Sequence, residues 1–589
     1  MSRKMAAAAI AFAVASAATA VAAEDSDIRQ LSGLWEASRH FPASVAGSLL
    51  LFVQDGHLVA DIDGYRVPAT VNGDHVSFSL PAGLGKFRGQ RSPGGREIHG
   101  FWLQPPIPGS GRPYISNVTL RARERGAWGG EIRPLRDSAT FFLPVTVAPD
   151  GTARTYLREP EANRGIFTNV GRVSRIGTEV DLLGLRRGEK TEEVLFKGFY
   201  HDGELTFPDF DDQLSYDFFR VEDANASAFY PRGSPPTPYH YSEPVDREDG
   251  WAVASLSDVG ISRSAIEKFI QKLIDAPMDS INTPQIHAVL IARHGKLVLE
   301  EYFHGYDRDR PHDTRSAAKS WTVTLIGAAI HSGVPIGLST PVYATMLGHD
   351  PADLDPRKMH MTLEHLLSMT AGFDCDENSG APGSEDTMQE QTAQPDWYKY
   401  TMDVPLVTAP GDKIQYCSAE PNLAAGMLEK VAGEPLPEMF DRLIARPLHM
   451  GTYYLVMTPT ETAYGGGGHY FLPRDFMKLP QLMLNGGKWR GRQVVSMTWA
   501  RSVGLPMHTL NTEPPLGQQY GYLWNSKQYP YKNRTVRGYF AAGNGGQIFM
   551  AIPDLDLVIA FCGGNYSDGA STRYAQRHLI PEDILPAVE

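Results

Sequence analysis

The stretch DTRSAAKSWTVTLIGAAI, residues 313–330, decides the fold of the C-terminal part of the chain. Asp313 and Thr314 are residue types that cap helices, and the apolar run behind them predicts that a buried helix begins here. Ser316 then lies in the first turn, and Lys319 lies one turn further along the same face. A serine hydroxyl needs an adjacent base, and burial together with the helix dipole disfavours the ammonium form of a lysine. The pair therefore predicts an activated serine.

Ser-x-x-Lys alone is a weak motif, but further segments follow it in order. LLSMTAGF at 366–373 ends a helix, and PGDKIQYCS at 410–418 leads into an apolar helix over 423–431. Near the C-terminus, GNGGQ at 543–547 opens an apolar β run, and residues 557–561 form a second one. The ordered set is more specific than any one of its members.

These segments resemble the serine β-lactamase and penicillin-binding-protein superfamily, in particular its class C β-lactamase-like branch of esterases, amidases and D-peptidases. The resemblance covers about residues 250–580 and implies an α+β domain, with an antiparallel sheet flanked by helices and a helical insertion between Ser316 and Gly465. The matching motifs are Ser316 with Lys319, Tyr416-Cys417-Ser418 at the place of Tyr-x-Asn, and Asn544-Gly545-Gly546 at the place of Lys-Thr-Gly.

The resemblance also implies roles for these residues. Tyr416 shares the proton transfer with Lys319, and the backbone N–H groups of Ser316 and Gln547 form the oxyanion hole. The expected substrate-binding residues are Ser418, Asn544, Gly545 and Gly546.

Two departures from the family pattern bear on the substrate. Ser418 is shorter than the usual asparagine, and Asn544 stands where a cation normally binds a substrate carboxylate. The sequence therefore favours an esterase or amidase. Arg573 is a candidate for a compensating cation.

Other functions stay open. A β-lactamase or D-Ala peptidase is the alternative within the class, and a catalytically inactive peptidoglycan- or partner-binding protein is the alternative outside it. The intact Ser316, Lys319 and Tyr416 argue against the inactive protein. The expected substrate is a small-molecule ester, amide or peptide, and no cofactor or metal is needed, since no His-Glu-x-x-His pattern occurs. Oligomeric state is not indicated.

The region over about 28–222 is predicted to be all-β, because short alternating runs are separated by Asp-Gly and Asn-Gly turns. The region shows a weak internal repeat, in which Trp128 corresponds to Trp35 and the turn at 150–151 corresponds to the turn at 55–56. The repeat indicates two β modules, 24–125 and 126–222. Recurrence of turn pairs in any β protein is the alternative explanation.

The composition changes twice more along the chain. Residues 223–249 are rich in Pro, Tyr, Ser and charge and are predicted to form a linker, which leaves 250–589 as the catalytic domain. At the N-terminus, Arg3 and Lys4 precede an Ala-rich apolar run, so residues 1–23 are predicted to be a signal peptide. No later stretch is long and apolar enough to span a bilayer, and a periplasmic or secreted protein is expected.

Charge and cysteine content bear on nucleic-acid partners, metal sites and disulfides. The net charge of -13 and the absence of a Lys/Arg block argue against a nucleic-acid partner. The three cysteines, Cys375, Cys417 and Cys562, fit no metal pattern. Spacing alone leaves one disulfide and three free thiols equally open, but the family resemblance places Cys375 and Cys417 near one site, where a bridge could form.

Overall fold

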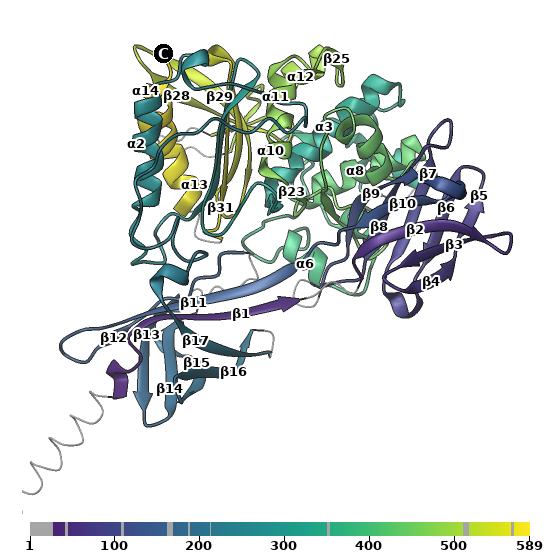
Figure 1. Ribbon diagram of the computed structural model, residues 1–589. Coiled ribbons are helices and arrows are strands. Elements are labelled where there is room, and N and C mark those ends of the chain that lie inside the picture. Colours follow the sequence, from purple (N-terminus) through teal and green to yellow (C-terminus); the bar gives the residue numbers. More distant parts are fainter. Residues whose placement is uncertain are drawn as a thin grey trace, which may run out of the picture.

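The computed structural model contains two β units at the N-terminal end and one mixed α and β domain at the C-terminal end (Figure 1). The expected signal peptide, 1–23, lies outside the described residues. The structure describes residues 27–41, 45–107, 111–161, 169–186, 189–211, 214–349, 354–510, 518–566 and 570–589.

The first β unit is a closed barrel. Its ring closes because β1 pairs antiparallel with both β11 and β17. Large aromatic side chains fill the interior, among them the fully buried Trp35, Phe141 and Phe207. The barrel strands, in order, are β1 (Gly33–Phe41), β11 (Asp137–Val147), β12 (Ala153–Arg154), β13 (Asn169–Ile176), β14 (Glu179–Leu185), β15 (Glu193–His201), β16 (Glu204–Asp211) and β17 (Leu214–Val221).

The second β unit is an antiparallel sheet around its own apolar core, which includes Leu49, Ile98 and Trp102. We call it the N-terminal sheet. Its strand order is β4 (Tyr65–Pro68), β3 (His57–Ile62), β2 (Gly47–Gln54), β10 (Trp128–Ile132), β9 (Tyr114–Ala122), β8 (Glu97–Gln104), β7 (Lys86–Arg91), β6 (His75–Ser79) and β5 (Thr70–Asn72).

The two β units do not follow one another along the chain as the expected boundary at 125/126 requires. Strand β1 precedes the N-terminal sheet but belongs to the barrel, whereas β10 follows the boundary yet pairs with β2. The physical reason is that closing the barrel needs an eighth strand, and β1 supplies it through pairing over more than 100 residues. Local alternation and turn signals contain no information about such distant pairing.

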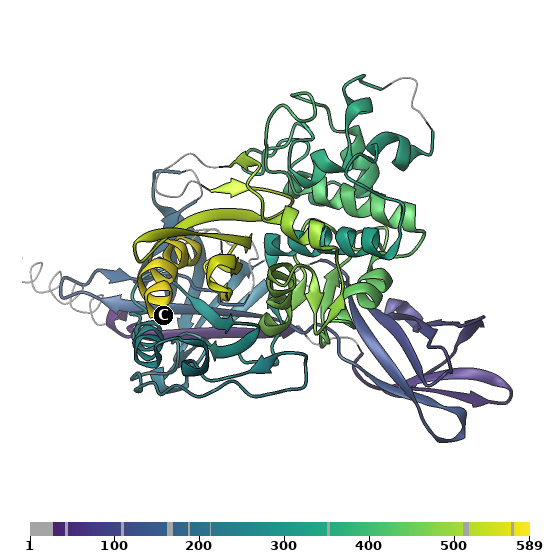
Figure 2. The ribbon, with the colours of Figure 1, turned by 90° about the horizontal axis from the view of Figure 1, so that it is seen from above.

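The C-terminal domain is built on a second large sheet, mostly antiparallel. One face is covered by helix α2 (Arg263–Ile274) and the C-terminal helical segment Ala575–Ile584, and the other by α10 (Pro473–Phe476) and α11 (Lys478–Leu484) (Figure 2). The α+β prediction is confirmed. The strand order is β18 (Ala252–Val253), β20 (Lys296–Tyr302), β19 (Ile286–Arg293), β31 (Leu557–Gly563), β30 (Gln547–Ile552), β29 (Arg534–Gly543), β28 (Asn525–Tyr531), β27 (Gln519–Tyr520) and β26 (His508–Thr509).

The helical region lies beside this sheet. Helix α8 (Ala419–Ala432) is buried over most of its length and packs on α3, α5 and α7. The other helices of the region are α3 (Lys319–Ser332), α4 (Val342–Leu347), α5 (Leu363–Leu367), α6 (Glu385–Glu390), α7 (Trp397–Asp403), α9 (Leu436–Phe440) and, after the next strands, α12 (Met497–Val503).

A continuous hydrogen-bonded ladder joins the N-terminal sheet to the C-terminal domain. Strand β9 pairs with β22 (Tyr454–Val456), β22 pairs with β23 (Tyr470–Phe471), and β23 pairs with β21 (His312–Asp313). Strand β21 ends three residues before Ser316. The N-terminal sheet is therefore connected through paired strands to the segment that carries the candidate nucleophile.

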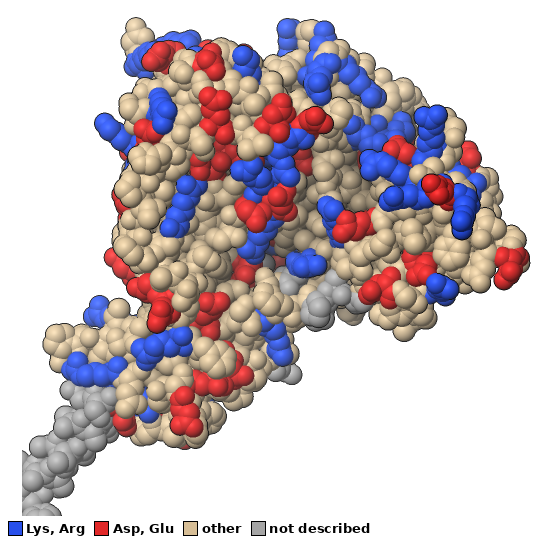
Figure 3. Space-filling model, viewed as in Figure 1, with Lys and Arg blue, Asp and Glu red and all other residues tan. Residues whose placement is uncertain are grey.

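The linker, 223–249, forms no strand and only one short 3₁₀ turn, Asp223–Asn225. It lies against the catalytic domain, because the Tyr241 hydroxyl donates to the Val298 carbonyl over 2.9 Å and Arg474 pairs with Asp249. On the face shown in Figure 3, positive and negative side chains are interspersed. Within the described residues, no helix is both long and apolar enough to cross a bilayer.

Candidate active site

Ser316 lies in a tight turn that strand β21 and a neighbouring loop hold in place. The turn, Arg315–Ala318, is a 3₁₀ segment that continues directly into α3. The Asp313 carboxylate accepts from the Arg315 N–H over 2.8 Å, and the Thr314 hydroxyl donates to the His469 carbonyl over 2.7 Å. Ser316 itself is partly exposed, so its hydroxyl is held at a helix start and remains open on one side.

Lys319 is buried directly behind Ser316, with only 1% of its surface exposed. Its amine donates to Ser316 Oγ over 3.0 Å and to the Gly466 carbonyl over 2.7 Å. The same Nζ lies 4.9 Å from the centre of the Tyr416 ring. The structure thus brings together the serine, lysine and tyrosine that the sequence singled out.

A disulfide fixes the loop that carries Tyr416. Cys417 is bonded to Cys375, across 42 residues of sequence, and Cys562 is a buried free thiol. The Gln415 N–H donates to the Met369 carbonyl over 2.8 Å, which ties the same loop to the end of α5. These contacts restrict the tyrosine to one side of Lys319.

The charge state of Lys319 differs from the sequence expectation. Burial lowers its pKa, but Tyr416 and the carboxylates of Glu385 and Glu377 raise it, and the net pKa lies above that of an ordinary lysine. The sequence analysis considered burial and the helix dipole, and it did not include the effect of Tyr416 or of the two carboxylates that the fold brings close from the helical region. Together these groups favour the ammonium form of Lys319.

Glu385 is the main acidic residue that the sequence analysis missed. Its carboxylate accepts from the Tyr464 hydroxyl over 2.9 Å and from the Gln389 side-chain amide over 3.2 Å. Burial raises its pKa, but Lys319, Arg315 and Arg112 lower it more, so the group stays ionised. No motif marks a single glutamate 66 residues after Lys319, and only the fold brings the two together.

Strand β29 approaches the serine turn at Gly543. A side chain at this position would place its Cβ 2.4 Å from the Thr314 carbonyl oxygen and 3.1 Å from the Ala317 nitrogen, so the close approach requires glycine. Asn544 follows at the exposed turn, on the same edge of the sheet. The structure therefore places Asn544 at the rim of the site.

Gly545 and Gly546 lie against residues of the C-terminal segment. A Cβ on Gly545 would lie 2.5 Å from Tyr566, and one on Gly546 would lie 2.5 Å from Ser571, so both glycines pack against the C-terminal segment. Gln547 is fully buried, and its side chain bonds the carbonyls of Gly563 and Asn544. The oxyanion-hole role of Ser316 and Gln547 stays a prediction.

Ser418 is buried at the start of α8, where its N–H donates to Glu377 over 2.5 Å. Arg573 is exposed on the C-terminal helix Ala570–Tyr574, whereas Arg315 and Arg112 both act on Glu385. Within the described part of the chain, no group of three or more His, Cys, Asp or Glu is arranged to hold a metal ion.

The family model described as beta-lactamase matches residues 270–578, which is more than half of the chain. The chain belongs to the β-lactamase family. The resemblance seen in the sequence is therefore confirmed, and this β-lactamase-family protein is a hydrolase of that fold. The site described above lies within the matched residues.

Similar proteins are hydrolases. The chain is 27% identical over 306 residues to the 6-aminohexanoate-dimer hydrolase of Paenarthrobacter ureafaciens, covering 49% of this chain and 68% of the relative. A putative 6-aminohexanoate-dimer hydrolase from Bacillus anthracis superposes with a TM-score of 0.42 and 21% identity, covering 50% of this chain and 78% of the other. EstCE1, a hydrolase with promiscuous acyltransferase activity, superposes with a TM-score of 0.43 and 20% identity, covering 55% of this chain and 97% of the other.

Proposed function

We propose that this β-lactamase-family protein is a serine hydrolase that forms an acyl-enzyme on Ser316 and acts on esters or linear amides. The single observation that carries the proposal is the hydrogen bond of 3.0 Å from the Lys319 amine to Ser316 Oγ, at the start of a buried helix. A serine at a helix start, with a lysine amine in hydrogen-bond contact and a tyrosine beside that amine, meets the geometric requirement for an activated nucleophile.

In the proposed reaction, Ser316 Oγ attacks the substrate carbonyl and gives its proton to the Tyr416 oxygen. The Lys319 amine donates to Ser316 Oγ and lies over the Tyr416 ring, so it positions the two groups for this transfer. The tetrahedral intermediate then collapses, the bond from carbonyl carbon to leaving group breaks, and Tyr416 returns the proton to the leaving group. A water molecule repeats the sequence on the ester of Ser316, which releases the acid and restores the serine proton.

The substrate preference rests on the rim of the site. Asn544 lies at the exposed turn next to Gly543 and carries no charge, so the rim lacks the cation at this position that would bind an antibiotic carboxylate. The relative named 6-aminohexanoate-dimer hydrolase supports an amide as one of the proposed substrates.

Export is part of the proposal. The Cys375–Cys417 disulfide is typical of oxidising compartments, and Arg3, Lys4 and the apolar run after them have the pattern of a signal peptide. N-terminal sequencing of protein from a periplasmic or culture fraction should give a chain that starts near Glu24. A chain that keeps Met1 and stays in the cytoplasm would overturn this part.

Hydrolysis of p-nitrophenyl butyrate tests the main proposal. Ser316→Ala should reduce kcat/KM at least about 1000-fold, because the acyl-enzyme can no longer form. Ser332→Ala, at the other end of the same helix, is the matched control and should stay within twofold of the wild type. Equal activity of Ser316→Ala and the wild type would refute the proposal.

A further inference from the structure

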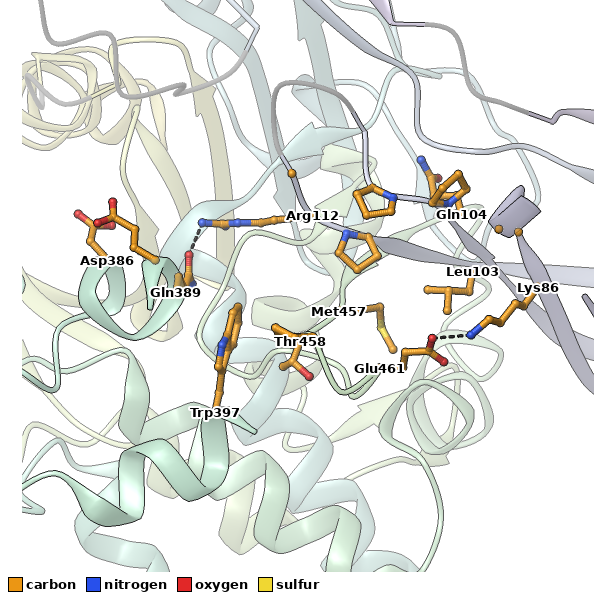
Figure 4. Close-up of a pocket in the computed structure, with 18 residues that line it drawn as sticks. Lys86, Leu103, Gln104, Arg112, Asp386, Gln389, Trp397, Met457, Thr458 and Glu461 are labelled. Carbon is orange, nitrogen blue, oxygen red and sulfur yellow. Dashed lines mark hydrogen bonds and ion pairs between the residues drawn. The ribbon is translucent and has the colours of Figure 1, made fainter. Parts of the chain in front are cut away.

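A cavity of about 680 Å³ lies where the N-terminal sheet meets the helical region (Figure 4). One wall comes from strands β7 and β8 and the loop before β9, and the other from α6, Trp397 and the loop after β22. Both the N-terminal sheet and the catalytic domain therefore contribute residues to the cavity. The β-lactamase family match begins at residue 270 and does not include the first wall.

The lining is apolar in the middle and polar at two ends. Leu103, Met457 and Trp397 lie between the two ends (Figure 4). At one end the Arg112 guanidinium donates to Gln389, and at the other the Lys86 amine pairs with Glu461 over 2.6 Å, as Figure 4 shows. This arrangement fits an elongated ligand with an apolar body.

The Arg112 end lies next to the candidate active site. Helix α6 begins with Glu385, which faces Lys319, and the following residues Asp386 and Gln389 line the cavity. A Cβ on Gly468 would lie 4.0 Å from Arg112 Nη1, and one on the adjacent Gly467 would lie 3.4 Å from the Ser316 Cα. The segment that contains these two glycines is therefore close to both the guanidinium and the serine turn.

We propose that this cavity is a subsite for the distal part of the substrate, and that the substrate is an ester or amide with a long, linear, uncharged acyl chain. The inference rests on the proposed function and adds to it the length and polarity of the chain. A cavity of this volume is in the range that holds small-molecule groups. A short acyl group bound at Ser316 would leave it unfilled.

Charge in the lining favours an uncharged chain. The cavity residues include two cations, Lys86 and Arg112, and three carboxylates, Asp386, Glu390 and Glu461. An anionic tail would therefore meet a net negative lining, whereas a carbonyl along the chain can accept from the Arg112 guanidinium. Each methylene buried in the apolar middle should raise kcat/KM about two- to fourfold until the cavity is filled.

Chain-length profiles test the subsite. The wild type should hydrolyse p-nitrophenyl decanoate with a higher kcat/KM than p-nitrophenyl acetate. Pro459 is an exposed residue of the cavity wall, so Pro459→Trp should fill the space without disturbing the core. It should lower kcat/KM for the decanoate at least about 10-fold and leave the acetate within twofold. Thr460→Trp, next to it and outside the lining, is the control.

Binding without turnover separates this inference from the proposed function. Octanamide titrated calorimetrically into the full-length Ser316→Ala protein should bind, acetamide should not, and adding Pro459→Trp should abolish octanamide binding. This result would support the subsite even if Ser316 were not the nucleophile. An absence of octanamide binding, or a chain-length profile that is the same in Pro459→Trp and the wild type, would overturn the inference.

Discussion

The guanidinium of Arg112 donates a hydrogen bond to the side-chain carbonyl of Gln389, and this contact joins the N-terminal sheet to helix α6 of the catalytic domain. The amide of Gln389 in turn donates to Glu385 over 3.2 Å, and Glu385 raises the pKa of Lys319. A residue outside the matched family region is therefore linked to the candidate catalytic lysine through two side chains.

Removing the Glu385 charge should shift the pH dependence of the enzyme. Glu385→Gln removes a carboxylate that raises the pKa of Lys319, so that pKa should fall and the ammonium should be lost at lower pH. The alkaline limb of kcat/KM for p-nitrophenyl butyrate should move to lower pH. Glu390→Gln, an exposed residue at the end of the same helix, should leave the limb in place. An unmoved limb in Glu385→Gln would contradict the role of Glu385.

The disulfide should contribute strongly to stability. It closes a loop of 42 residues, which corresponds to about 4 kcal/mol in the loop-entropy model. The double variant Cys375→Ser/Cys417→Ser should unfold at a lower temperature in scanning calorimetry. A reductant should lower the Tm of the wild type but not that of the variant. If the reductant has no effect on the wild type, the bridge is not formed in the purified protein.

Acid should destabilise the fold through buried histidines. Burial lowers the pKa of His304 to about 3 and that of His312 to about 4, whereas both titrate near 6.5 in the unfolded chain. The unfolded state therefore binds more protons below about pH 6.5, and stability falls as the pH falls from there toward about 4. Each histidine should lower the free energy of unfolding by about 1.4 kcal/mol for each unit by which the pH falls within this window.

Thermal unfolding at pH 7 and pH 5 measures this effect. The Tm of His304→Asn should fall less between the two pH values than that of the wild type, because one buried histidine has been removed. The exposed His57 provides the control, and His57→Asn should follow the wild type. Equal pH dependence in all three proteins would show that His304 is not the source.

A cation at the rim should change the substrate ratio. Asn544→Lys should raise the ratio of kcat/KM for a chromogenic cephalosporin to kcat/KM for p-nitrophenyl butyrate by about 10- to 150-fold. This factor corresponds to one charge-assisted hydrogen bond of about 1.5 to 3 kcal/mol. Asn544→Gln adds length without charge and should leave the ratio near that of the wild type. A wild type that already prefers the cephalosporin would contradict the proposed esterase or amidase preference.

The sequence predicted the features that depend on local order. The helix behind Ser316 follows from its apolar run, and the strands at 547–552 and 557–563 follow from short apolar runs between turns. The pairing of β1 with β11 could not be predicted, because nothing local relates residues 33–41 to 137–147. The direction of the pKa shift of Lys319 could not be predicted for the same reason, since Tyr416 and Glu385, which raise that pKa, reach the lysine only through the fold.

Covalent labelling tests the central claim most directly. A fluorophosphonate probe should react with the native protein, and mass spectrometry should locate a single adduct on the peptide that contains Ser316. Labelling should disappear in Ser316→Ala and persist in Ser332→Ala. An adduct on a different serine, or undiminished labelling of Ser316→Ala, would show that Ser316 is not the nucleophile.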